Sequence, residues 1–160
     1  GMTNLAVIAE RRVDRLVHPD LNQGLPPFLT QDAGVSSGYM IAQVTAAALA
    51  SECKVLSHPA SVDSIPTDGN KEDVVPMAMG AAWKLRRVVA NVRNILAIEL
   101  LCGAQGIDFR RPLRSSAPVE QAHTIVRALV PSMDRDRAVS PDILLVAGAI
   151  AGGRFAATEI

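Results

Sequence analysis

Apolar side chains recur at spacings of three and four residues along most of this chain, which is the pattern of helices with one buried face. His18 and Pro19 end the first such segment, because a residue before proline is driven out of the helical region. Thr3 can cap its start, and Pro118 and Pro141 each begin a later segment. The predicted helices cover residues 3–16, 37–56, 71–106, 118–130 and 141–151.

Three loops separate these helices. Residues 19–36 and 57–70 are rich in glycine, proline, asparagine and aspartate, and residues 107–117 form a basic loop. Loops as long as residues 19–36 are uncommon inside one domain unless they are functional or wrap a neighbour. We therefore expect a helical chain with extended loops, without internal repeats.

Two segments are apolar on every side of the predicted helix rather than on one face. They are residues 38–50 and residues 95–102. A helix of this kind must be surrounded by protein. The helix over 71–106 would span about 50 Å at about 1.5 Å per residue, longer than a chain of this size is wide. We therefore expect part of it to project or to pack against another chain, as in a homo-oligomer.

The composition supports an all-α fold. Hydrophobic residues make up 49% of the 160 residues but aromatic residues only 3%, so the core must consist of Ala, Leu, Val and Ile. Strands favour aromatic and β-branched residues, and closely packed helices favour alanine. We predict a helical bundle with one long central helix, as a single domain over residues 3–160. Gly1 and Met2 resemble the remnant of an expression tag and a start methionine.

The charge balance argues against two classes of partner. Sixteen basic and sixteen acidic residues cancel, so the chain lacks the basic excess that nucleic acid or an acidic membrane surface would require. Charges at Arg11, Arg12 and Asp14 interrupt any leader-like apolar run, and we expect a soluble, cytoplasmic protein. Cys53 and Cys102 lie in apolar segments and are expected to be buried free thiols.

Few residues fit a known catalytic pattern. His18, His58 and His123 have no metal-ligand spacing, so we expect no metal site and exposed histidines in loops and helices. The chain has no glycine-rich nucleotide motif and no nucleophile elbow. Glu72 and Asp73 are the pair of interest. They are predicted to interact with the dipole at the start of a helix, or to place a carboxylate in a cleft.

Much of the chain resembles the histidine ammonia-lyase family, in order and without large gaps. The segments that carry the similarity are GLPPFL at 24–29, SGYMIAQVTAAALASE at 37–52, HPASVDSIPT at 58–67, NKED at 70–73, LAIELL at 96–101, AQG at 104–106, DFR at 108–110 and SPD at 140–142. The resemblance is to the C-terminal part of such a lyase, and it implies the corresponding helical fold and a central helical oligomer.

The resemblance also implies which parts of the chemistry this chain lacks. The family forms an electrophilic methylidene-imidazolone group from an Ala-Ser-Gly triplet, and no such triplet occurs here, so this cofactor cannot form in this chain. The catalytic tyrosines belong to the missing part, and Tyr39 lies in a motif that the family uses for packing. No catalytic residue is therefore assigned. Glu72 matches the glutamate that contacts the substrate imidazole in histidine-selective members.

The motif around Glu72 departs from the family pattern. Lys71 replaces the usual Gln, Val74 the usual His and Pro76 the usual Ser, and Cys53 stands where an Asn is usual. These changes beside the substrate glutamate argue against conventional turnover of histidine.

Three functional hypotheses follow. The first is a lyase fragment that is inactive alone and becomes half of a split ammonia-lyase when a separately encoded N-terminal half is present. The second is a non-catalytic helical oligomerisation or regulatory protein derived from the lyase fold. The third is a helical ligand-binding domain, which the long loop at 19–36 would permit.

Overall fold

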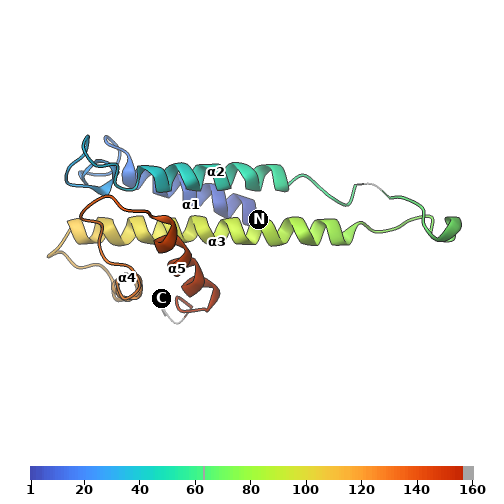
Figure 1. Ribbon diagram of the computed structural model, residues 1–160. Helices are drawn as coiled ribbons and strands as arrows, with labels where there is room; N and C mark the ends of the chain where they lie inside the picture. Colours follow the sequence, from blue (N-terminus) through green and yellow to red (C-terminus); the bar gives the residue numbers. More distant parts are fainter. Residues whose placement is uncertain (63, 157–160) are drawn as a thin grey trace.

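Three long helices lie side by side and form the body of the computed structural model, which describes residues 1–62 and 64–156 (Figure 1). They are α1 (Met2–Val17), α2 (Met40–Leu56) and α3 (Ala78–Phe109). α1 runs parallel to α3, and α2 runs antiparallel to both. Asp63 and residues 157–160 of the predicted domain lie outside the described residues.

Two shorter helices pack against the C-terminal half of α3 (Figure 1). They are α4 (Ala117–Arg127), which crosses α3 steeply, and α5 (Ser140–Ala151). Two single 3-10 turns, η1 (Pro27–Leu29) and η2 (Asp68–Asn70), lie in the loops. No strand forms among the described residues, and the prediction of an all-α bundle around one long helix is confirmed.

The core is built from small and aliphatic side chains, as the composition predicts. Alanines at every fourth position of α2 place one narrow face against its neighbours and let the helix backbones approach closely. The buried set from the three long helices includes Ala6, Ala9, Val13, Ala42, Ala46, Ala50, Val92, Ile95, Ile98 and Leu101. All buried residues of α3 lie at or beyond Val88, so the second half of this helix is the deeper one.

The loop over residues 19–36 closes one end of the bundle. Leu29 is fully buried, and the Tyr39 amide donates to the Phe28 carbonyl at 2.9 Å. The buried side chain of Gln105 in α3 donates to the Met133 carbonyl at 3.0 Å and accepts the Met133 amide at 3.1 Å. The Gln105 amide also donates to the Leu29 carbonyl at 3.5 Å, so this one side chain joins the long loop to the end of α3.

Helix α3 begins seven residues later than predicted, at Ala78 instead of residue 71. Three consecutive residues at 68–70 adopt the left-handed conformation and turn the chain back before the helix can start. Glu72 pairs with Thr67 across this turn, and neither Glu72 nor Asp73 lies in the first turn of a helix. The interpretation of this acidic pair as a helix-dipole pair is therefore wrong.

Two further predictions about helix starts are also wrong. The hydroxyl of Thr3 donates to the Cys53 carbonyl of α2 at 3.3 Å instead of capping α1. The second helix begins at Met40, three residues later than predicted, because Gly38 is left-handed with φ of 53° and the helical conformation starts after it. The starts of α4 and α5 agree with the prediction to within a residue, since Pro118 and Pro141 lie in their first turns.

An arm, defined as residues 57–77, extends with the first turns of α3 beyond the ends of α1 and α2 (Figure 1). The ammonium group of Lys84 donates to the His58 carbonyl and ties the base of the arm to α3. The expectation that part of the long helix projects is confirmed. Within the described residues, α3 is also the one helix long and apolar enough to cross a membrane, and 56% of the apolar window concerned is buried against the rest of the fold.

Candidate functional site

The arm is a hairpin whose two sides pair in one register. The Val75 amide donates to the hydroxyl of Ser64 at 2.6 Å. Closer to the tip, the Thr67 amide donates to the Glu72 carbonyl at 3.0 Å, and the Glu72 amide donates to the Thr67 carbonyl at 3.4 Å. Both pairs fit the same antiparallel alignment of the two sides, which places Glu72 at the end of the arm.

The turn at the tip depends on residues that tolerate a left-handed backbone. Asp68, Gly69 and Asn70 have φ values of 48°, 62° and 67°. Glycine, asparagine and aspartate are the residue types that adopt this conformation most readily. The Lys71 amide donates to the Asp68 carbonyl at 3.2 Å, and the Lys71 ammonium lies 3.9 Å from the Asp68 carboxylate. The substitution of Lys71 for the family's Gln thus adds a cation at the tip.

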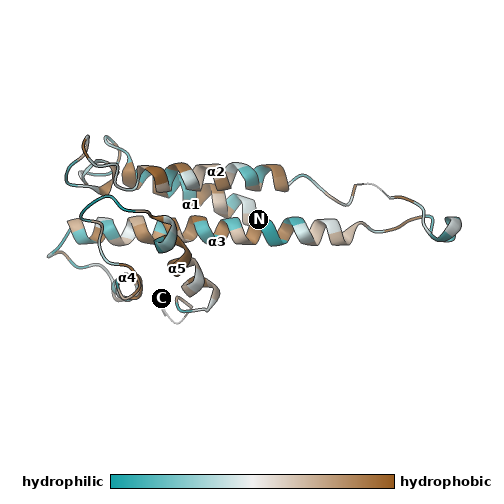
Figure 2. Ribbon diagram, in the orientation of Figure 1, coloured by the Kyte–Doolittle hydropathy of each residue, from teal (hydrophilic) through white to brown (hydrophobic). Residues whose placement is uncertain are grey.

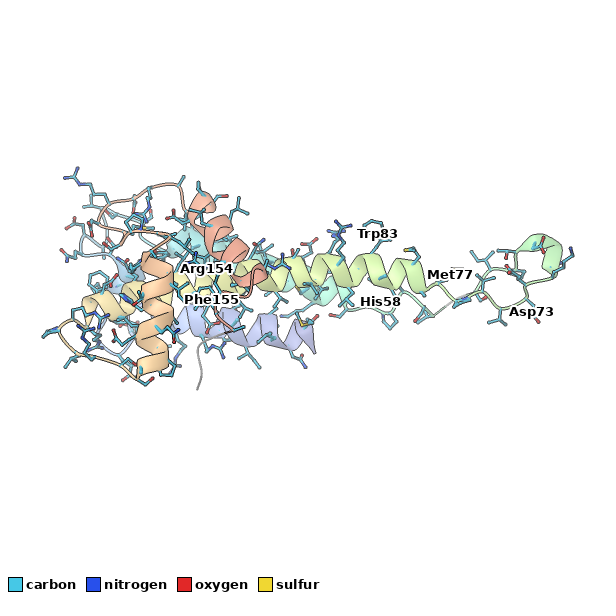
Figure 3. The ribbon with its side chains drawn as sticks, turned by 90° about the horizontal axis from the view of Figure 1, so that it is seen from below. His58, Asp73, Met77, Trp83, Arg154 and Phe155 are labelled. Atoms are coloured by element: carbon cyan, nitrogen blue, oxygen red, sulfur yellow. The ribbon has the colours of Figure 1, made fainter. Side chains whose placement is uncertain are left out.

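Glu72 is held at the tip by one side-chain contact. Its Oε2 accepts a hydrogen bond from the hydroxyl of Thr67, and no bond to Oε1 is found among the described residues. Every residue from 64 to 74 is exposed, and Figure 3 shows the neighbouring Asp73 at the far end of the molecule. Figure 2 shows that the turn itself is hydrophilic. The predicted site residue is therefore exposed, and one of its carboxylate oxygens has no hydrogen-bond partner among the described residues.

Apolar side chains are exposed along the arm and on the first turns of α3. Trp83 is 57% exposed and stacks with Arg86, whose guanidinium carbon lies 5.2 Å from the ring centroid. Trp83 points away from α3 in Figure 3. The other large exposed side chains of this region are Val62, Ile65, Val74, Met79 and Leu85. Such a concentration is typical of a surface that another protein segment covers.

A second cluster of charged side chains lies at the opposite end of α3. The His123 Nε2 atom lies 2.6 Å from Oδ1 of Asp108, and Arg127 donates to Oδ2 of the same carboxylate at 2.8 Å. The His123 side chain is only 13% exposed, so the expectation of an exposed helix histidine is wrong for this residue. Sequence reasoning missed the contact because its partner lies on another helix.

This cluster adjoins an apolar groove of about 560 Å³ between α3, α4 and α5. Leu100, Ile107, Val119 and Phe155 are among its lining residues, together with His123. Among the described residues, no serine, threonine or cysteine lines the groove beside His123. The cluster joins α3 to α4 and has the geometry of a structural network.

The remaining candidate groups are buried. Cys53 and Cys102 are both free and buried, as predicted. Burial raises the pKa of the Cys102 thiol well above its usual range, and the thiol is a poor nucleophile for that reason. Tyr39 is fully buried, and its hydroxyl has no partner among the described residues. Its burial agrees with a packing role. No group of three or more His, Cys, Asp or Glu residues suited to a metal ion occurs in the described part of the chain.

Comparison with known proteins places these features in a family. Residues 1–128 match the family model for aromatic amino acid lyases. The chain is 53% identical over 157 residues to a histidine ammonia-lyase of Koribacter versatilis, covering 98% of this chain and 30% of that protein. It is 53% identical over 155 residues to a histidine ammonia-lyase of Deinococcus radiodurans, covering 97% of this chain and 29% of that protein.

Solved structures show the same arrangement of helices. The crystal structure of histidine ammonia-lyase from Trypanosoma cruzi superposes with a TM-score of 0.93 at 46% identity, covering 98% of this chain and 30% of that one. Tyrosine aminomutase from Streptomyces globisporus gives a TM-score of 0.93 at 39% identity, with the same shares of the two chains. The chain spans about three tenths of the length of these relatives, and it belongs to the aromatic amino acid lyase family.

Proposed function

We propose that this chain supplies the helical bundle and the substrate-facing arm of a histidine ammonia-lyase, whose active site is completed by polypeptide outside these residues. The observation that carries the proposal is the position of Glu72, which lies on an exposed tip with one carboxylate oxygen free of any partner among the described residues. The identity of 53% to proteins named histidine ammonia-lyase supports histidine as the substrate.

Glu72 is suited to bind the imidazole ring of a substrate. A carboxylate accepts a hydrogen bond from a ring nitrogen, or exchanges a proton with it, because the pKa of free histidine lies near neutrality. In this proposal the Oε1 atom takes that role, since Oε2 already accepts the Thr67 hydroxyl. Lys71, Val74 and Pro76, which differ from the family motif, lie in the same arm.

The residues of this chain do not supply the electrophile that the reaction requires. Elimination of ammonia from an amino acid removes a weakly acidic proton and a poor leaving group, which acid–base residues alone do not achieve. The group that the family resemblance implies forms from an Ala-Ser-Gly triplet, and the 160 residues contain none. We therefore propose that the isolated chain is inactive and that a polypeptide carrying this triplet restores activity.

The buried free thiols of Cys53 and Cys102 support a place in the reducing cytoplasm. The exposed apolar faces support self-association, with a second copy of the chain as the expected partner. A non-catalytic oligomerisation protein is the alternative, and the departures from the family motif at Lys71 and Val74 favour it.

Complementation tests the proposal directly. The chain is co-expressed with the remaining part of the Koribacter versatilis lyase, which is truncated to exclude the matching region, and urocanate formation from histidine is followed by absorbance. We expect no product from the chain alone and steady product from the complex. Product from the purified chain alone would overturn the proposal. A stable complex without product would favour the non-catalytic alternative.

A further inference from the structure

We propose that Thr67 is a positioning residue for Glu72, and that its hydroxyl holds the carboxylate in one orientation with the second oxygen free for the substrate. This inference rests on the proposed function, in which Glu72 contacts the substrate. The Thr67 hydroxyl donates to Oε2 of Glu72, while two backbone bonds join the same two residues. Thr67 therefore contacts Glu72 through both its backbone and its side chain.

The three bonds have different consequences. The backbone pair fixes where the Cα atom of Glu72 lies, because it closes the turn over residues 68–71. It leaves the side-chain torsions of Glu72 free, and a glutamate has three of them. Only the hydroxyl bond acts on the carboxylate itself. A threonine side chain is suited to this task because its branched Cβ restricts rotation about χ1 and so holds the hydroxyl in one direction.

No other described residue performs this task. Ser64, the next side chain to bond across the arm, contacts the Val75 amide and fixes the hairpin closer to its base. The Lys71 ammonium lies against the Asp68 carboxylate, at 3.9 Å. Since the tip is exposed, packing does not restrict the glutamate either. The Thr67 hydroxyl is thus the one contact that orients the Glu72 carboxylate before a substrate binds.

A substitution pair separates the hydroxyl from the backbone. Thr67→Val keeps the branched shape and both backbone bonds but removes the hydroxyl, and Thr67→Ser keeps the hydroxyl. Thr124→Val is a matched control, because the exposed Thr124 hydroxyl donates to the Glu120 carbonyl within α4, far from the arm. The first measurement uses the full chain alone. NMR scalar couplings across χ1 of Glu72 report whether this side chain has one rotamer or an average.

We expect one dominant Glu72 rotamer in the parent chain and in Thr67→Ser, and averaged couplings in Thr67→Val. Averaged couplings already in the parent chain, or unchanged couplings in Thr67→Val, would overturn the inference. This measurement needs no activity, so its result is independent of whether the proposed function holds.

The second measurement uses the complemented enzyme. Loss of one oriented hydrogen bond is expected to lower kcat/KM for histidine by about tenfold in Thr67→Val, with Thr67→Ser and Thr124→Val close to the parent. Melting temperatures should be alike in all three variants. If Glu72→Gln has no effect on activity, the proposed function fails. If Glu72→Gln abolishes activity while Thr67→Val matches the parent, the role of Thr67 fails and that of Glu72 stands.

Discussion

Gly38 shows how one residue can fix the junction between a loop and a helix. Its φ is 53°, and a Cβ atom added there would lie 2.4 Å from the carbonyl oxygen of Phe28. The Asp136 carboxylate accepts the amides of Ser37 and Gly38 at 2.7 and 2.9 Å. The backbone at this point is therefore held from two sides, and α2 starts two residues later, at Met40.

We expect Gly38→Ala to destabilise the fold strongly. The left-handed conformation disfavours alanine, and the close oxygen belongs to the backbone and cannot rotate away, so the free energy of unfolding should fall by at least about 2 kcal/mol. Gly148→Ala is the control, because Gly148 lies in α5 with no heavy atom within 4 Å of the added Cβ. Urea unfolding followed by circular dichroism measures both. Equal stability of the two variants would contradict this account of Gly38.

At the scale of elements, local patterns predicted helices and missed contacts between distant residues. Pro118 and Pro141 mark helix starts within their own segments, and both predictions hold. The predicted start of α3 at residue 71 is wrong because Pro76 also fits a first helical turn. Only the pairing of Thr67 with Glu72 shows that the chain folds back there. The side chain of His123 was predicted to be exposed, and this prediction is wrong for a similar reason. Its partner Asp108 lies 15 residues earlier, on another helix.

The start of α4 offers a test of electrostatics at this scale. Hydrogen bonds from the Arg111 guanidinium and from the Ser115 amide lower the pKa of Glu120 to about 2. The distances are 2.8 Å from Arg111 to Oε2 and 2.9 Å from Ser115 to Oε1. Glu120 thus joins the loop after α3 to the first turn of α4.

A carboxylate whose pKa is lower in the folded state stabilises the fold above its unfolded pKa, here the ordinary value of 4.5. This stabilisation is lost as the pH falls from about 4.5 to about 2. We expect Glu120→Gln to remove that part of the pH dependence, so that its melting temperature falls less than that of the parent over this range. Asp20→Asn, in an exposed loop, should keep the parent profile. A Glu120→Gln profile that parallels the parent would show that this carboxylate contributes nothing.

At the scale of the whole molecule, the accessible surface area is larger than that of a typical monomer of the same mass. The accessible surface is 9611 Å² for a mass of 16.9 kDa. Monomers of this mass expose about 7,700 Å² on average, which is about 1,900 Å² less. The projecting arm accounts for part of the difference. Apolar residues on α2 and α5 form another part, with Ile41, Val44, Leu144 and Leu145 all more than half exposed.

We expect the chain to self-associate through the face between α2 and α5. Ile41 and Leu144 line one groove of about 600 Å³ on this face. Covering 1,000 Å² of apolar surface is worth on the order of 25 kcal/mol before the costs of association. Light scattering at micromolar concentration should give a multiple of 16.9 kDa. Ile41→Glu should lower that mass because it buries an unpaired charge, whereas Val35→Glu, on a loop residue that is 93% exposed, should leave it unchanged. A mass near that of one chain, unchanged as the protein concentration rises, would contradict this prediction. It would show that the chain is a monomer whose apolar faces need no partner.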